Sequence, residues 1–164
     1  MPSSQKFKNV VYYTYMPNKI YLDLTEDAEP PQWFSTEKTI SFIDTVLNHL
    51  QYTNWEVSVL FCSNDFIQKL NKQYRNIDEP TDVLSFALNE AGSQFPYTTG
   101  DIIISFKALQ ENANFFNETE PKECMRLLVH GLLHLAGYEH STNNEDEPML
   151  QLQETILEKL QAEW

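Results

Sequence analysis

The sequence predicts an α+β fold, with a single domain in which a mixed sheet of about four strands packs against about five helices. Three observations lead to this prediction. The chain has 164 residues, about the length of one domain. Its apolar residues alternate in some segments, as in strands, and recur every third or fourth position in others, as in helices. The first two strand-like runs are close together, which is typical of a hairpin.

The N-terminal part contains these two strand-like runs and one amphipathic helix. Val10–Tyr15 and Ile20–Leu24 are rich in β-branched and aromatic residues, and a Pro-containing turn separates them. An acidic loop follows. Ser35 or Thr36 is then a suitable N-cap, and apolar residues at helical spacing predict a helix over 36–51.

The middle of the chain alternates strands and helices. Trp55, Val57, Val59 and Phe61 alternate with other residues and predict a strand. A helix capped by Ser63 follows, and its apolar face carries Phe66, Ile67, Leu70 and Tyr74. Two more strands are predicted at Val83–Leu88 and Asp101–Phe106, joined by a longer loop. A helix at about 107–116 comes next.

A long helix and a final helix complete the chain. Thr119 is a suitable N-cap for the long helix, and Pro121 falls in its first turn, where a missing N–H costs little. Leucines on nearly all sides of this helix indicate that it is buried. Gly137 is placed to end it. The last helix is expected at about 145–162.

The composition excludes several classes of protein. Cys62 and Cys124 cannot form a disulfide framework and fit a reducing compartment as small buried residues. No run of about 18 apolar residues indicates a membrane span, and the N-terminus has no secretory signal, so we expect a cytoplasmic protein. The net charge of −13 repels polyanions at long range. A nucleic-acid partner would therefore need a local basic patch or a metal.

Three of the four histidines fall in the segment HGLLHLAGYEH. His130 and His134 are four residues apart on one helix, so their side chains lie on the same face, about 5–6 Å apart. Gly137 allows the chain to reverse, and His140 can then return as a third ligand. Three neutral nitrogens and one vacant position are typical of a catalytic zinc site. The sequence thus predicts one Zn²⁺ per chain at the end of the buried helix, although nickel and copper also bind three imidazoles.

Two alternatives to a catalytic zinc site need to be weighed. A closed structural site would require a fourth protein ligand, and neither Glu139 nor Cys124 is suitably placed to supply one. The spacing H-x3-H-x2-G-x2-H is also that of the metzincin peptidases. Those enzymes have a glutamate base after the first histidine, where this chain has Gly131. A metallopeptidase-like hydrolase therefore stays an alternative without its usual base.

The sequence resembles the YbeY endoribonucleases, a family of ribosomal RNA maturation factors. HGLLHLAGYEH fits the family pattern H-G-x-L-H-L-x-G-Y-D-H, with Glu139 in place of aspartate. LNKQYRNIDEPTDVLSF followed by GDIIIS is the second matching block, although Ala87 stands where the family often has proline. The tail around Met149 also fits. The resemblance covers about residues 55–160, whereas residues 1–52 of the expected single domain (1–164) are the least diagnostic.

This resemblance implies a zinc-dependent endoribonuclease that is selective for single strands. The implied role is in maturation of small-subunit (16S) ribosomal RNA and in ribosome quality control. It also implies that His130, His134 and His140 are the metal ligands and that Arg75, in the motif LNKQYR, is catalytic. The expected partners are single-stranded RNA, in particular ribosomal RNA, and the ribosome or its proteins, with no membrane partner.

The residues around Arg75 are consistent with a role in phosphate binding. Arg75 ends a predicted helix beside a loop, and Lys69, Lys72 and Arg75 are spaced by three on one side of that helix. A guanidinium can form two hydrogen bonds to a phosphate and favour the added charge of its transition state. For the lysines, a solvated helix face is the favoured interpretation. Arg126 shares a stripe with His130 and is expected to face the same cleft.

The sequence leaves three roles open. Asp82 could orient a histidine or cap the loop before its strand. Because Gly131 can move no proton, the base could be a metal-bound hydroxide, Glu139 or the 2′-hydroxyl of the RNA. A ribosome assembly factor with a structural metal also stays an alternative, and the strongly acidic composition favours it.

Overall fold

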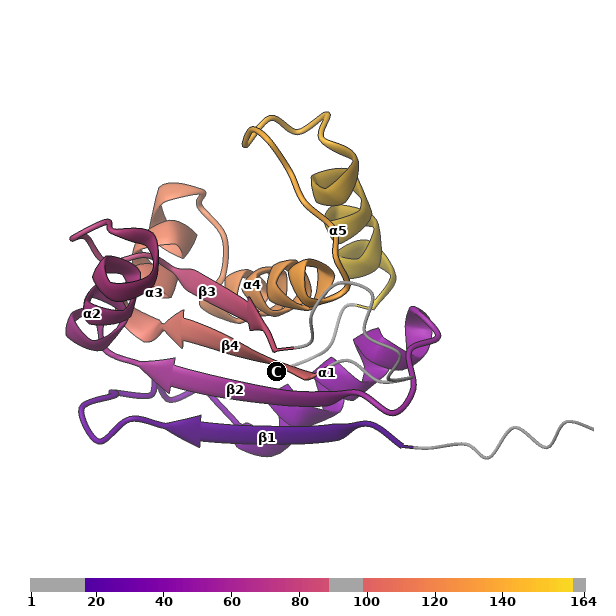
Figure 1. Cartoon of the computed structure of the whole chain (residues 1–164), viewed down its shortest axis with the longest axis horizontal. Coiled ribbons are helices and arrows are strands. Elements are labelled where there is room, and N and C mark those ends of the chain that lie inside the picture. The colour runs from indigo at the N-terminus through magenta and orange to yellow at the C-terminus, as the bar shows by residue number, and fades with distance from the viewer. Residues whose placement is uncertain (1–16, 89–98, 161–164) are drawn as a thin grey trace, which may run out of the picture.

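The computed structural model describes residues 17–88 and 99–160 and confirms the predicted α+β fold (Figure 1). The elements are, in chain order, β1 (Lys19–Leu24), α1 (Thr36–His49), β2 (Glu56–Cys62), α2 (Asn64–Arg75), β3 (Val83–Ala87), β4 (Thr99–Ser105), α3 (Phe106–Phe115), α4 (Glu120–Leu135) and α5 (Pro148–Lys159). Three of the predicted N-caps are formed as expected. The hydroxyls of Ser35, Ser63 and Thr119 accept hydrogen bonds from backbone N–H groups in the first turns of α1, α2 and α4.

The four strands form one mixed sheet in the order β1-β2-β4-β3. β1, β2 and β4 are parallel, and β3 runs antiparallel to β4. Ile20–Leu24 lies in β1, which pairs in parallel with β2 because α1 forms the crossover between the two strands. The run expected to form a hairpin with it, Val10–Tyr15, lies outside the described residues, so the hairpin stays a prediction.

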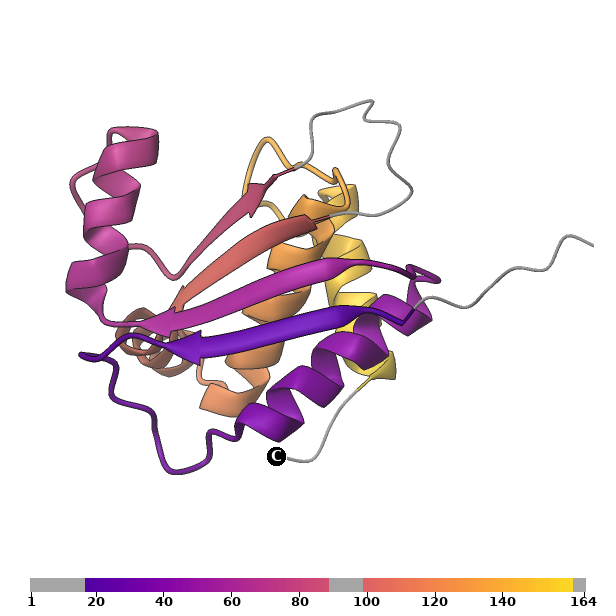
Figure 2. The ribbon, with the colours of Figure 1, turned by 60° about the horizontal axis from the view of Figure 1, so that its bottom comes forward.

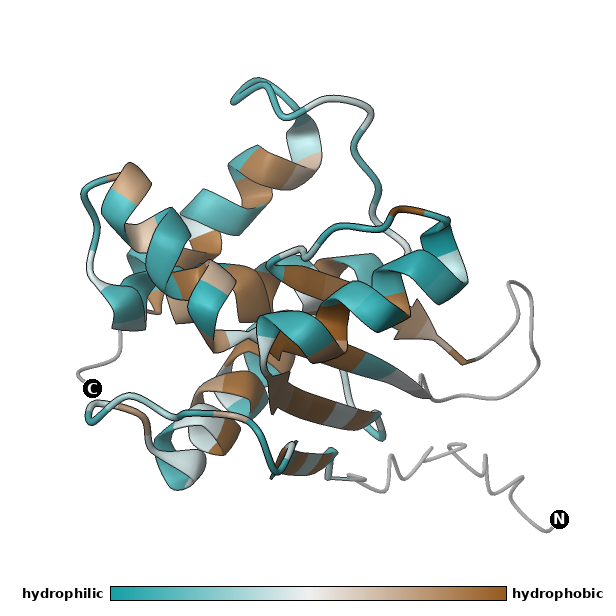
Figure 3. Ribbon diagram, turned by 90° about the vertical axis from the view of Figure 1, so that its left-hand side faces the viewer, coloured by the Kyte–Doolittle hydropathy of each residue, from teal (hydrophilic) through white to brown (hydrophobic). Residues whose placement is uncertain are grey.

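The main core lies between the sheet and two helices, α1 and α4, which cover one of its faces (Figure 2). Val57, Val59 and Phe61 of β2 point into this core, as the alternating pattern predicted. Apolar residues are concentrated on the strands and on the sides of helices that face them (Figure 3). Gly131 of α4 lies against Ile102 of β4, where an added Cβ would come within 2.9 Å of the Ile102 side chain. The glycine thus allows α4 to approach the sheet closely.

Among the described residues, α2 covers part of the opposite face of the sheet. Ile67 of α2 is fully buried against Cys62, Leu84 and Ile103. Tyr74, expected on the same apolar face, is instead mostly exposed and packs its ring on Phe86, with 5.0 Å between ring centroids.

Three remaining predictions can be compared with the structure. Cys62 and Cys124 are both buried, and burial raises the pKa of the Cys62 thiol to about 12, so it stays protonated. α5 begins later than expected, at Pro148, a residue well suited to the first turn. Within residues 17–88 and 99–160, the helices are either too short or too polar to cross a membrane.

Candidate metal centre and cleft

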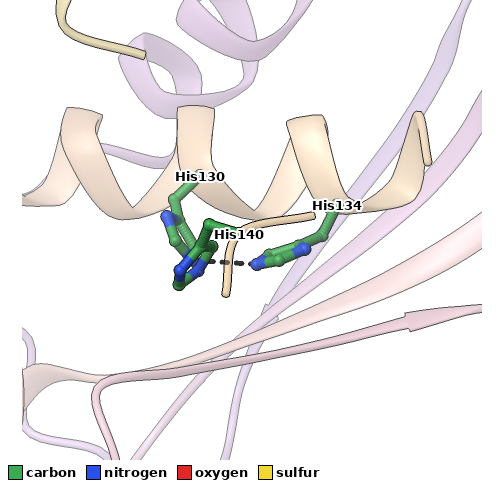
Figure 4. A group of neighbouring side chains, drawn as sticks. All are labelled: His130, His134 and His140. Atoms are coloured by element: carbon green, nitrogen blue, oxygen red, sulfur yellow. Dashed lines mark hydrogen bonds between the residues drawn. The ribbon is translucent and has the colours of Figure 1, made fainter. Parts of the chain in front are cut away.

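The end of α4 brings the three histidines of HGLLHLAGYEH together. Gly137 has φ +92°, a left-handed conformation that favours glycine. The Tyr138 N–H donates to the Leu133 carbonyl, and the Gly137 N–H donates to the His134 carbonyl. These two bonds form a Schellman motif, which ends the helix and reverses the chain. The reversal carries His140 back beside the two histidines on the helix (Figure 4).

One ligand nitrogen from each of His130, His134 and His140 can be chosen so that all three lie within 4.8 Å of one another. The Nε2 atoms of His130 and His134 are 3.0 Å apart. The ring centroid of His140 is 5.1 Å from that of His130 and 5.3 Å from that of His134. Among the described residues, this group contains no fourth side chain. The geometry is therefore that of a three-nitrogen site with an open position.

The hydrogen bonds on the opposite ring nitrogens fix which atoms face the centre. His134 Nδ1 is 3.0 Å from the Tyr138 carbonyl oxygen, and His140 Nδ1 is 2.9 Å from the Thr142 carbonyl oxygen. A carbonyl oxygen can only accept, so both Nδ1 atoms carry the hydrogen. His130 Nδ1 is 2.8 Å from Oε1 of Gln153 and donates to it. Each neutral ring therefore presents a lone pair on Nε2 to the centre.

The electrostatics of the cluster fit a bound cation. Burial lowers the pKa of His130 and His134, and for both the neighbouring His140 lowers it further. The rings of His130 and His134 are therefore neutral near pH 7. Two lone pairs that face each other at 3.0 Å repel, and a divalent ion between them would turn this repulsion into coordination. The donor set and the tautomers fit the metal that the sequence predicts.

The histidines lie in a cleft of about 470 Å³. α4 forms one wall from Glu123 to His134, and residues of α2, β3, α3, α5 and the loops complete it. The cleft contains Arg75, Asp82 and Arg126, three residues to which the sequence assigned candidate roles. Glu139 is exposed and is not among the residues that line the cleft.

Arg75 ends α2 at the cleft, as predicted. Its side chain is exposed and makes no ion pair or hydrogen bond with the described residues. Of the two lysines on the same side of α2, Lys72 is paired with Asp78 at 2.7 Å, and neither lysine lines the cleft. The lysines thus belong to a solvated helix face, and the guanidinium of Arg75 alone from this stripe is available in the cleft.

Arg126 faces the cleft, but its guanidinium is already bound. Its nitrogens contact carboxylate oxygens of Glu123 at 2.6 Å, Glu154 at 2.8 Å and Glu118 at 3.3 Å. The Glu123 side chain is 3% exposed, so Arg126 neutralises a buried charge. Its place in the cleft is as expected, but its partners leave it no free donor edge for a phosphate.

The two roles left open for Asp82 can now be separated. Its Oδ1 accepts from the Val83 N–H at 2.8 Å, and its Oδ2 accepts from Asn112 Nδ2 at 2.8 Å. Asp82 therefore caps the start of β3 and is not hydrogen-bonded to a histidine. The residue that orients His130 is Gln153 of α5, which sequence reasoning missed. The available signal was a glutamine on the otherwise apolar buried stripe of that helix.

Comparison with known proteins identifies the family of the chain. The family model described as "Endoribonuclease YbeY" matches residues 25–161. A protein of that name from Treponema denticola is 45% identical over 147 residues, covering 87% of this chain and 93% of the relative. Another from Borreliella afzelii is 48% identical over 124 residues, covering 72% and 82%. A solution structure of a Thermotoga maritima protein has a TM-score of 0.59 and 30% identity over 86% of this chain and 88% of that chain. The chain belongs to the endoribonuclease YbeY family.

Proposed function

We propose that this protein is a zinc-dependent endoribonuclease that cuts single-stranded RNA, with a role in the maturation of small-subunit ribosomal RNA. His130, His134 and His140 are the metal ligands and Arg75 is the catalytic arginine. The names of the relatives support the reaction. The observation that most supports the site is the convergence of the histidine Nε2 atoms with every Nδ1 already bonded.

A divalent cation held by three nitrogens supplies positive charge to a phosphoryl oxygen and lowers the pKa of water. Three neutral imidazoles and an open position are the donor set of catalytic zinc sites. Gln153, the Tyr138 carbonyl and the Thr142 carbonyl hold the rings in the required tautomer. The protein therefore prepares the site before a metal or substrate arrives.

The exposed guanidinium of Arg75 is the group that meets the phosphodiester. It lines the cleft with the three histidines and forms no ion pair with a carboxylate in residues 17–88 and 99–160. Two parallel N–H donors match two phosphate oxygens and stabilise the charge that develops as a fifth oxygen approaches phosphorus. The net charge of −13 opposes the binding of RNA, which is a polyanion. Arg75 acts on a phosphate at short range, where salt screens its charge least.

Gly131 disfavours the metallopeptidase alternative. The glycine follows the first histidine, where the related peptidases have their glutamate base. Here the position is buried against Ile102, and a larger residue would press on the sheet. The protein therefore has no peptidase base at this position, and the proton of the nucleophile must pass to a different acceptor.

RNA cleavage by the purified protein tests the proposal. Untagged protein should cut a labelled single-stranded RNA, and a chelator or His134→Ala should abolish cleavage. His49→Ala is the matched control, since His49 is an exposed histidine at the end of α1, outside the cleft. It should cleave like the wild type. Cleavage that survives His134→Ala would contradict metal catalysis at this site.

The ends of the products identify the nucleophile. A 2′,3′-cyclic phosphate indicates attack by the RNA's own 2′-hydroxyl, whereas a 5′-phosphate indicates attack by water. If the protein binds ribosomes tightly but cuts no RNA under any metal, it is an assembly factor with a structural ion. That result would contradict the proposed enzyme.

A further inference from the structure

Two adjacent phenylalanines at the end of α3 are unusually exposed. Phe115 is 83% exposed and Phe116 is 61% exposed. Their rings contact each other edge to face, with centroids 5.0 Å apart and planes at 89°. Large apolar side chains exposed together in this way mark interaction sites more often than single exposed residues do.

Phe116 lines the same cleft as the three histidines and Arg75. It lies near the start of α4, because it is followed within two residues by Glu118, which pairs with Lys122 and Arg126 of that helix. The histidines lie at the other end of the helix. From Glu123 to His134, the wall formed by α4 is about 16 Å long at 1.5 Å per residue. Phe116 and the metal centre are therefore at opposite ends of one groove.

The charges along the groove indicate which part of an RNA each end can bind. At the histidine end, Arg75 is available for a phosphate. Between the ends, Asp82 and Glu123 line the cleft, and Arg126 is occupied by carboxylates. A phosphate has no available cation there among the described residues. An uncharged, planar group suits the Phe116 end better.

We propose that Phe116, supported by Phe115, stacks on an unpaired base of the bound RNA. The base belongs to a nucleotide near the one that is cut, not to the cut nucleotide itself, because the groove separates Phe116 from the histidines. A base in a duplex is stacked between its neighbours and cannot offer its face, so this site favours single strands. The inference rests on the proposed function and adds a contact that determines substrate selectivity.

Binding and kinetics of Phe116 variants test this site. The probe is a fluorescent single-stranded RNA with 2′-O-methyl groups, checked first to be uncut. Phe116→Ala should weaken its binding about 5- to 100-fold and should raise KM more than it lowers kcat on ordinary RNA. Phe116→Trp should bind like the wild type because it keeps a stacking surface. Binding unchanged in Phe116→Ala would overturn the proposal.

Tyr21→Ala is the matched control. Tyr21 is 53% exposed on β1, and it lines a different, apolar depression that shares no residue with the metal cleft. Its removal should leave RNA binding unchanged. Equal weakening by Tyr21→Ala and Phe116→Ala would show a nonspecific effect of losing surface aromatics and would contradict the proposal. Circular dichroism of each variant checks that it is folded.

A single abasic residue, moved along the RNA, separates stacking from other contacts. Wild-type protein should lose affinity when the abasic residue occupies one position, and Phe116→Ala should show no further loss at that position. If the abasic residue and Phe116→Ala weaken binding additively at every position, Phe116 contacts no base and the proposal is overturned. If the variant weakens ribosome binding but not binding of this RNA, the site takes a protein and the proposal fails. Loss of all RNA cleavage in wild-type protein would instead contradict the proposed function.

Discussion

Arg75 and Arg126 line the same cleft, yet their surroundings are opposite. Arg75 is exposed at the end of α2 and has no carboxylate partner among the described residues. The Arg126 side chain is 19% exposed and is bound by three carboxylates, one of them almost fully buried. The same chemical group therefore serves two purposes: Arg75 keeps its donors for a ligand, and Arg126 uses its donors to hold α4, α5 and the segment before α4 together.

The comparison shows why a position in a cleft does not define a catalytic residue. An arginine acts on a phosphate only if its donors are available when the substrate arrives. Saturation by carboxylates makes Arg126 a structural residue even though it lies on the stripe of the metal ligands. Each arginine can thus be assigned a structural or a catalytic role, according to whether its loss affects stability or catalysis.

The largest effect is expected for Arg126→Met. Removal of the guanidinium leaves Glu123 buried without a counter-charge, which costs about 3–5 kcal/mol in unfolding free energy. Urea denaturation measures this loss. Arg126→Lys should recover only part of it, since an ammonium cannot bind the three carboxylates in the same geometry. If Arg126→Met is as stable as the wild type, Arg126 is not the structural residue that the comparison makes it.

Arg75→Ala should have the converse effect. We expect kcat for RNA cleavage to fall roughly 10²- to 10³-fold because a donor to the transition state is lost. The unfolding free energy should stay within about 0.5 kcal/mol of wild type, since an exposed residue without partners is removed. Single-turnover cleavage and urea denaturation measure the two quantities. A marked loss of stability without loss of kcat would make Arg75 a structural residue like Arg126.

An intermediate effect is expected for Gln153→Leu, which removes the acceptor for His130 Nδ1. Residues that orient metal ligands typically contribute about 10- to 100-fold to metal affinity. Competition with a chromophoric chelator measures the affinity for zinc. Gln151→Leu changes an exposed glutamine on the same helix and should leave the affinity unaltered. Equal zinc affinities for the two variants would show that Gln153 does not support the metal site.

The smallest effect is expected for Lys72→Ala. The pair of Lys72 with Asp78 is short, at 2.7 Å, but both side chains are about 60% exposed. Such exposed pairs contribute little to stability. RNA cleavage should not change because Lys72 does not line the cleft. A loss of cleavage as large as that of Arg75→Ala would extend the catalytic site along α2.

Local signals in the sequence predicted much of the fold and the histidine cluster. Ser35, Ser63 and Thr119 cap helices through residues three positions away, so a short window contains the whole interaction. The same holds for His130 and His134 on one helix, and for the glycine turn that returns His140. All of these depend on neighbours along the chain.

Features that depend on distant residues could not be predicted in this way. β1 pairs in parallel with β2, across the helix that separates them. Arg126 is bound by Glu154, which is 28 residues away. Gln153 reaches His130 only because α5 packs on α4. Spacing placed Arg126 near the cleft, and the resemblance to the YbeY family implied Arg75 there. Of the partners that distinguish the two arginines, Glu154 comes from another element, α5.

The most direct test of the metal centre is a crystal structure of the zinc-loaded, untagged protein, with the ion located by anomalous scattering. The expected result is one ion bound by Nε2 of His130, His134 and His140 at about 2.0–2.1 Å, with no fourth protein ligand. An ion held through the Nδ1 atoms, or one enclosed by a fourth side chain, would contradict the proposed catalytic site.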